Sequence, residues 1–500
     1  MCVLCKAGRG PHVSRRSFMS GAMAATAAGA LLPFTAPQVA KAAQAAMPDG
    51  VGQVGARTLI KGGHILSMDK AVGDFTGDIL LEGRKIIEIA PQIDAPDAIV
   101  IDAAGKIVTP GFIDTHHHGF ETALRSFLPD GIMFADPTRP GVPSYLEDIL
   151  GKFSMVYRPE DIYIAQLFGG LSQLDAGVTT VLDVSQIHHS PAHSDAVIAG
   201  LKDVGRRSVF GYFEGYGPEL QYPQDARRLR SEYFTSDDQL MTMLMGGEVY
   251  LPNVDPMELW NLGKELDLMV GLHVVGSLGM RETMDRLIPH YTENHLFIHM
   301  TGMSDAAWNR AKEVGAHISL SVPIEMQMRH GQPPIQKAID MGLAASLSTD
   351  VECTMTADFF TQMRSAMTWQ RALANEAALE NGPENAPALI GVRDVLEMAT
   401  LNGAKGLKLD HKTGSLSVGK EADILILDAT ALNVAPLNNA AGAVVTLMER
   451  HNVETVFVAG EIKKWQGRIV GHEVEALVAR IAESRDYLFD AAGLEVPLFD

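Results

Sequence analysis

Short apolar runs alternate with longer helical stretches along the middle of the chain, roughly between residues 114 and 409. Examples of the apolar runs are VTTVLDVS, SVFGYFEG, DLMVGLHVV, HLFIHM, AHISLSV and LAASLSTD. Repeated strand–helix units of this kind predict parallel strands joined by crossover helices, and this many units favour a closed barrel. The fold class that we expect is therefore α/β, with a (β/α)8 barrel.

Both flanks of that region have a different pattern, namely short β segments separated by glycine and aspartate. The segments are TLIKGGHILSMD, GDILLEGRKIIEIA and AIVIDAAGKIVT on one side, and GSLSVGKEADILILD and VETVFVAGEIKKWQGRIVG on the other. This punctuation is typical of hairpins and β-sandwiches. We expect a composite β-sandwich domain from residues 57–110 plus 412–472, a barrel over residues 111–411, and a C-terminal helix and tail over residues 473–500.

Residues 1–45 have the pattern of an export signal. The run SRRSFM at residues 14–19 precedes an Ala-rich apolar stretch, and Ala43-Gln44-Ala45 has the form of a cleavage site. The apolar stretch is shorter than the roughly 20 residues that a membrane span needs. We therefore expect a twin-arginine signal, recognition by the twin-arginine export machinery, a periplasmic or secreted location, and no stable membrane insertion.

Composition excludes some classes of partner. Hydrophobic residues make up 46% of the chain and charged residues 20%, as in a globular protein with a sizeable core. A formal net charge of −20 argues against nucleic acid as a partner and favours a small-molecule substrate. Once the signal is removed, Cys353 is the one cysteine left, so no disulfide is expected within a chain. The oligomeric state stays open, and a homo-oligomer is compatible with these features.

The stretch PGFIDTHHH, residues 110–118, runs from an apolar strand directly into three histidines. Because side chains alternate along a strand, we expect His116 and His118 to share a face with Asp114, and His117 to point the other way. In a barrel this pair would lie at the carboxyl end of the first strand, where barrel enzymes carry their chemistry. Two imidazoles in this arrangement form a chelate for zinc, iron or manganese.

Three more apolar strands end in residues that can bind a metal: His273 in GLHVV, His299 in HLFIHM and Asp350 in SLSTD. A single histidine at a strand end is more often structural, but the coincidence of several favours a site. We expect one divalent ion, with zinc as first choice and iron or manganese as alternatives, and a position left for water. The expected metal ligands are His116, His118, His273 and Asp350. His299 is expected beside the water and the substrate.

The chain resembles the amidohydrolase superfamily, in the branch that holds cytosine deaminase and the triazine-degrading hydrolases. The resemblance covers nearly the whole mature chain and rests on PGFIDTHHH followed by ETALRS, DAGVTTVLDVS, HMTGMSDAAW, SLSTD and ATLNGAKGLKLDHKTGSLSVGKEADILILD. It implies a distorted TIM (β/α)8 barrel flanked by a β-sandwich, and one divalent metal. It also implies two catalytic residues: Asp350, which passes the proton of the water to the leaving nitrogen, and His299, which polarises the carbonyl group.

The chain departs from that pattern at one position. Deaminases of the branch carry a glutamate three residues after the third metal histidine, and here that position is Gly276. Loss of this acid favours amide, lactam, urea or carbamate cleavage over attack on an aromatic C=N bond. Glu325 in PIEMQMRHG is a candidate replacement, or else a solvated loop carboxylate. Glu121 and His188 are further candidates for substrate binding, although a surface histidine is the commoner case.

The segment SVFGYFEG, taken as the fourth strand, contains no lysine that could be carbamylated to bridge two metals, so a single ion is favoured. The sequence therefore predicts a metal-dependent hydrolase of a non-peptide carbon–nitrogen bond in a cyclic amide, urea or carbamate. An aminohydrolase, or deaminase, of a nitrogen heterocycle is the alternative. A second alternative is an exported binding protein without catalytic activity.

Overall fold

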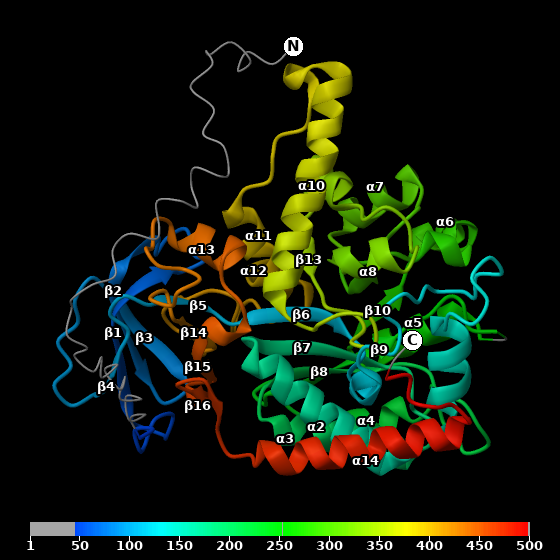
Figure 1. Ribbon diagram of the computed structural model, residues 1–500, viewed down its shortest axis with the longest axis horizontal. Helices are drawn as coiled ribbons and strands as arrows, with labels where there is room; N and C mark the ends of the chain where they lie inside the picture. The colour runs from blue at the N-terminus through cyan, green and yellow to red at the C-terminus, as the bar shows by residue number, and fades with distance from the viewer. Residues whose placement is uncertain (1–45, 253, 499–500) are drawn as a thin grey trace, which may run out of the picture. The chain divides into compact units, whose positions relative to one another are not determined.

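The computed structural model describes residues 46–252 and 254–498, and residues from Met47 onward form one compact unit (Figure 1). The expected twin-arginine signal at residues 1–45 lies outside the described residues. Among the described residues, no helix is both long enough and apolar enough to cross a membrane.

Eight parallel strands form the sheet at the centre of the molecule, and they pair in chain order from β6 to β13. A parallel bridge between His117 and Asp350 joins its two edges. The prediction of an α/β barrel is thereby confirmed. The strands are β6 (Phe112–His117), β7 (Val178–Ser185), β8 (Arg207–Tyr212), β9 (Met241–Gly246), β10 (Met269–His273), β11 (His295–Ile298), β12 (His317–Leu320) and β13 (Ser346–Leu347).

Strand β9 corrects the sequence-based strand count. The segment SVFGYFEG contains β8, the third barrel strand, whereas the fourth strand is β9 with the sequence MTMLMG. Methionine is unbranched at Cβ and has no strong preference for strands, so this segment lacks the pattern that marks the other strands. Because β9 also contains no lysine, the argument against a carbamylated lysine on the fourth strand is unchanged.

Helices follow most of the barrel strands, and residues that favour helix caps stand at their ends. Asp255 caps the amino end of α5 and precedes Pro256, while α7 begins after Ser304 and ends at Gly315 in the left-handed conformation. The helices in the barrel region are α2 (Pro159–Asp175), α3 (Pro191–Val204), α4 (Ala226–Tyr233), α5 (Pro256–Glu265), α6 (Arg281–Leu287), α7 (Asp305–Val314), α8 (Val322–Gln327), α9 (Ile335–Met341), α10 (Phe359–Asn381), α11 (Val392–Ala399) and α12 (Leu401–Gly406).

Strands from both ends of the described chain form a second sheet, which Figure 1 draws in blue and orange at the left. Its two halves meet where β5 pairs antiparallel with β14, with Ile107 opposite Leu427. The exact domain boundaries stay a prediction. The strands are β1 (Arg57–Leu66), β2 (Asp74–Glu82), β3 (Lys85–Ala90), β4 (Ile99–Asp102), β5 (Ile107–Pro110), β14 (Ile424–Leu427), β15 (Val453–Val458), β16 (Glu461–Trp465) and β17 (Arg468–Ile469).

Two further helices complete the fold, α13 (Ala440–Thr446) and α14 (Val474–Ala492). Helix α14 packs on α2, where the Ser484 hydroxyl donates a hydrogen bond of 2.8 Å to Asp161 and the Arg158 guanidinium lies over the Tyr487 ring. The expected C-terminal helix is therefore present, and it covers the outer side of the barrel (Figure 1).

Candidate active site

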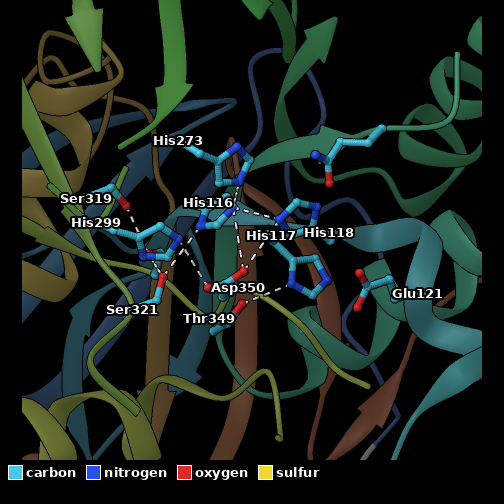
Figure 2. Close-up of polar contacts among 12 residues, drawn as sticks. His116, His117, His118, Glu121, His273, His299, Ser319, Ser321, Thr349 and Asp350 are labelled. Atoms are coloured by element: carbon cyan, nitrogen blue, oxygen red, sulfur yellow. Dashed lines mark hydrogen bonds and ion pairs between the residues drawn. The ribbon is translucent and has the colours of Figure 1, made fainter. Parts of the chain in front are cut away.

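Four side chains from different strands meet at the carboxyl end of the barrel (Figure 2). His116 belongs to β6 and His273 ends β10, while His299 and Asp350 directly follow β11 and the β13 region. His273, His299 and Asp350 line a cavity of about 250 Å³, as does His118. Because the carboxyl ends of parallel strands open on one face of a barrel, residues separated by more than 200 positions in the chain reach one another here.

The ring nitrogens of His118 and His273 both lie close to that of His116. The His116 Nε2 atom lies 2.9 Å from His118 Nε2 and 3.1 Å from His273 Nε2. Asp350 Oδ1 lies 3.7 Å from His116 Nε2 and 3.5 Å from His118 Nε2. Nitrogens bound to one zinc ion at about 2.1 Å would lie roughly 3 to 3.4 Å apart, so each of these two nitrogen pairs has the spacing of ligands to one ion. Around His116, ligand atoms all lie within 4.8 Å of one another in two groups, one with His118 and Asp350 and the other with His273 and His299.

Burial keeps two of these rings in the form that binds a metal. Burial, and then the neighbouring histidines, hold the pKa of His116 and of His118 well below the usual value, so both rings are neutral at pH 7. Burial raises the pKa of Asp350 to about 7, against the opposing effect of His273. A bound cation would favour the carboxylate form, because an opposite charge at this distance stabilises the ionised group.

Glu248 orients the third histidine, although no sequence pattern marks it as a functional residue. Its carboxylate lies 2.6 Å from His273 Nδ1 and also accepts the backbone N–H of His273. Burial alone would lower the pKa of His273, but Glu248, together with Asp350 and Glu214, outweighs burial and raises it. This is the usual carboxylate–histidine arrangement behind a metal ligand. Glu248 follows β9, the strand that the sequence pattern did not reveal.

Two residues of the site have strained backbone conformations. His299 has φ 70° and Asp350 has φ 63°, in the left-handed region that residues other than glycine seldom adopt. Backbone hydrogen bonds maintain this conformation: Asp350 donates to the His116 carbonyl at 3.0 Å, and His118 donates to the Asp350 carbonyl at 2.9 Å. Such strain is typical of positions whose side chains must point at a reaction centre.

Asp114 does not share the face of His116 and His118, so that part of the prediction is wrong. Its carboxylate accepts a hydrogen bond of 2.8 Å from Gln173 of α2 and another from Thr349. The pairing of β6 with β7 shifts register between Asp114 and His117, and this irregularity breaks the simple alternation. His117 points away from the cluster as expected, with Nδ1 3.0 Å from Thr349 Oγ1.

The three residues expected to bind substrate lie behind the cavity wall. Glu325 Oε1 lies 3.1 Å from His299 Nδ1, and Glu121 accepts a hydrogen bond of 2.7 Å from the Tyr145 hydroxyl. His188 Nδ1 lies 3.0 Å from Ser194 Oγ. None of the three is among the described residues that line the cavity. Glu325 and Glu121 therefore do not line the cavity themselves. Each contacts a residue that does, His299 and Tyr145 respectively.

His330 also lines the cavity. Its ring lies 4.7 Å from that of His299, and neither of its nitrogens has a hydrogen-bond partner among the described residues. His330 follows α8 in a loop, where no strand periodicity marks a functional residue. It faces the same space as Asp350 and could contact a bound substrate.

A model of the Amidohydrolase family matches residues 107–463. The chain belongs to the amidohydrolase family. This family membership makes the chain an enzyme, a hydrolase of non-peptide carbon–nitrogen bonds, and sets aside the alternative of a binding protein without activity.

Two curated relatives align with nearly the whole of their own length. A 5'-deoxyadenosine deaminase of Methanosarcina mazei is 25% identical over 447 residues, covering 86% of this chain and 98% of that protein. A 5-methylthioadenosine/S-adenosylhomocysteine deaminase of Nitratidesulfovibrio vulgaris is 24% identical over 456 residues, covering 89% and 97%.

Solved structures share the fold of this amidohydrolase. An adenosine deaminase from Xanthomonas campestris with bound zinc superposes with a TM-score of 0.74 at 22% identity, covering 87% of this chain and 99% of that one. The zinc complex of an atrazine chlorohydrolase from Arthrobacter aurescens gives a TM-score of 0.72 at 20% identity, covering 86% and 100%. The prediction of a distorted TIM barrel is consistent with both.

The walls of the amidohydrolase cavity are mostly apolar. Asp350 is the one carboxylate among the described residues that line it. At the position of the missing acid, a Cβ atom on Gly276 would lie 3.0 Å from both the Thr301 carbonyl oxygen and the Gly302 Cα atom. The backbone of Thr301 and Gly302 therefore crowds a side chain at position 276 and would have to move by a few tenths of an ångström to admit one. The apolar wall residues include Met133, Leu146, Leu150, Val275, Leu278 and Met328.

Proposed function

We propose that this amidohydrolase hydrolyses a carbon–nitrogen bond in a small, largely apolar amide, urea or carbamate, with one divalent ion, preferably zinc. His116, His118, His273 and Asp350 would hold the ion. The observation that carries the proposal is that His116 Nε2 lies within 3.1 Å of both His118 Nε2 and His273 Nε2, while Asp350 Oδ1 lies 3.5 Å from His118 Nε2. When bound, such an ion supplies Lewis acidity that activates water at neutral pH.

Asp350 and His299 act on the reacting atoms in this proposal. Asp350 Oδ2 has no hydrogen-bond partner among the described residues and lies 3.5 Å from His299 Nε2. From that position Asp350 takes a proton from the attacking water and delivers it to the leaving nitrogen. His299 orients the carbonyl oxygen of the substrate, and Glu325 is a positioning residue that fixes the His299 ring through Nδ1.

The lining of the cavity supports this substrate class. Apolar walls would bind an apolar substrate body at about 0.8 kcal/mol per buried methylene group. Hydrolysis of an aromatic C=N bond also needs a proton donor at the ring nitrogen, and Gly276 cannot supply one. Amide, urea and carbamate cleavage need a proton only at the leaving nitrogen, which Asp350 can deliver.

Deamination of a nitrogen heterocycle is the second candidate, and the names of the curated relatives favour it. In that case His330 is the residue placed to contact a ring nitrogen, because it faces the cavity with both of its own nitrogens unpartnered. The two candidates use the same metal ligands and differ in the product, since only deamination releases ammonia from an exocyclic amine.

The test is a screen of the zinc-loaded protein against phenyl-substituted amides, ureas, carbamates and aminated heterocycles. Substrate loss is followed by chromatography and ammonia by a coupled assay. We expect turnover of an amide, urea or carbamate without ammonia from exocyclic amines. Asp350→Asn should reduce kcat/KM by a factor of about 100 or more, since it removes the proton carrier. Ammonia release from the heterocycles alone would instead establish the second candidate.

We also propose that the chain is exported through the twin-arginine pathway, on the basis of Arg15, Arg16 and the cleavage-type sequence at residues 43–45. Replacement of both arginines by lysine should retain the full-length precursor in the cytoplasm. Cell fractionation with an antibody checks this, and unchanged export of the double variant would contradict it.

A further inference from the structure

The two carboxylate oxygens of Asp350 face different histidines (Figure 2). Oδ1 lies 3.5 Å from His118 Nε2, within the set that we expect to hold the first ion. Oδ2 lies 3.5 Å from His299 Nε2 and has no hydrogen-bond partner among the described residues. A cation bound through Oδ1 therefore leaves Oδ2 available to a second one.

His330 completes a second group of ligand atoms. One such atom from each of His299, His330 and Asp350 lies within 4.8 Å of the other two. Neither ring nitrogen of His330 has a hydrogen-bond partner among the described residues, although the residue is only 3% exposed. A buried imidazole without partners is unfavourable, and a bound ion would satisfy one of its nitrogens.

The three side chains all line the cavity of about 250 Å³, so an ion can approach them through it. An ion lies between its ligand atoms at about 2.1 Å, a shorter distance than any contact with water or an organic group. It therefore needs little open surface on the individual atoms. Ligands of one ion lie roughly 3 to 3.4 Å apart, so the group has to contract by at most about 1.5 Å.

Glu325 supports His299 in the way that Glu248 supports His273. Glu325 Oε1 lies 3.1 Å from His299 Nδ1 and also accepts the backbone N–H of Ser321. A carboxylate at one ring nitrogen directs the other nitrogen, here Nε2, toward a metal. His299 is thus oriented as a metal ligand, although it is not one of the four residues expected to hold the first ion.

We propose that His299, His330 and Asp350 form a second site for a divalent transition-metal ion such as zinc, with Asp350 shared between the two ions. Two imidazole nitrogens and one carboxylate oxygen are ligands that zinc accepts, with a position left for water. No carbamylated lysine is needed, because Asp350 is the bridging group.

The second ion should bind at least about 100-fold more weakly than the first, because it has fewer protein ligands and lies near another cation. Dialysis against metal-free buffer should therefore leave the first ion alone in the protein.

The test is equilibrium dialysis of the full chain against buffered zinc, from about 1 nM to about 100 μM free ion, followed by elemental analysis. We expect one equivalent at the low end and a second equivalent at the high end. His330→Phe removes both nitrogens and keeps an aromatic ring, so it should lose the second equivalent and retain the first. His290→Phe removes an exposed histidine and should still bind both.

One equivalent in the parent at every zinc concentration would overturn the inference. So would a second equivalent that persists in a folded His330→Phe variant or disappears in His290→Phe, since it would then lie on the protein surface. If His330→Phe does not fold, Glu325→Gln decides. It should weaken the second equivalent by about 10- to 100-fold and leave the first unchanged, and unaltered binding of both would refute the site.

The effect of the second ion on the reaction rests on the proposed function. Asp350 Oδ2 and His299 Nε2, assigned there to the proton and to the carbonyl oxygen, would both be bound by this ion. Turnover of the parent should therefore fall at the free zinc concentration that fills the second site. His330→Phe, compared with its own rate at low zinc, should show no such fall.

The two proposals can fail separately. Turnover that continues with both sites filled would contradict the roles of Asp350 and His299 in the proposed function and leave the second site in place. Turnover in a parent that never binds more than one equivalent of zinc would refute the second site and leave the hydrolase in place.

Discussion

Gly276 and Gly302 approach each other so closely that a Cβ atom on Gly276 would lie 3.0 Å from the Gly302 Cα atom. The Gly276 N–H also donates a hydrogen bond of 3.2 Å to Thr301 Oγ1, which in turn donates to the His330 carbonyl. The glycine that replaces the expected acid is therefore part of a contact that holds the His330 loop against the segment after β10.

Substitution of Gly276 should therefore cost stability without restoring an acid. Gly276→Ala is expected to lower the free energy of unfolding by about 1 to 3 kcal/mol, because the neighbouring backbone must move. Gly276→Glu should cost more and should not produce ammonia release from aminated heterocycles. Denaturant unfolding measures the first effect, with the exposed Ser277→Ala as control. A stable Gly276→Glu variant with new deaminase activity would contradict this, because it would show that the site can accept an acid at position 276 and use it.

Glu248 should control the affinity for the metal through His273. In Glu248→Gln the ring loses its charged partner at 2.6 Å, so we expect zinc affinity to fall by about 10- to 100-fold with little change in fold. Competition with a chromogenic chelator measures the affinity. Glu282→Gln on the exposed side of α6 is the matched control. Equal zinc affinity in Glu248→Gln and the parent would contradict the positioning role.

Glu121 should make the protein less stable as the pH rises. Burial raises its pKa to about 8 from a usual value of 4.5, so the folded state binds this proton more tightly than the unfolded chain does. Its stabilising effect is complete below pH 4.5 and is lost as the pH rises from there to about 8. The expected slope is at most about 1.4 kcal/mol per pH unit.

The comparison of Glu121→Gln with the parent isolates this contribution. Free energies of unfolding measured between pH 5 and 8 should fall less steeply in Glu121→Gln, while the exposed Glu147→Gln should follow the parent. Identical slopes for all three proteins would mean that Glu121 does not keep its proton in the folded state.

The sequence contained enough information for the barrel and for the residues that meet at its end. His116, His273, His299 and Asp350 each close an apolar strand, and the carboxyl ends of parallel strands necessarily open on one face. Alternation failed at Asp114, because the register shift in β6 is set by pairing with β7 rather than by the residues themselves. The methionine-rich strand β9 escaped notice because its composition has no clear strand preference.

The residues that orient a metal ligand or line the cavity could not be predicted in the same way. Glu248, His330 and Gln186 lie in the loops and turns that follow barrel elements, where neither period 2 nor period 3.6 applies. Their importance depends on partners that are distant in sequence, such as Glu248 with His273 and Gln186 with Tyr250. Such pairs become visible only when the chain is folded.

His116, His118, His273 and Asp350 are expected to bind one divalent ion. Elemental analysis of the purified, metal-supplemented protein tests this, beside a variant that carries both His116→Ala and His118→Ala and is confirmed to be folded by circular dichroism. We predict about one equivalent of a transition metal, with zinc preferred, in the parent, and almost none in the variant. A well-folded parent without metal, or a variant that retains the full equivalent, would contradict the account.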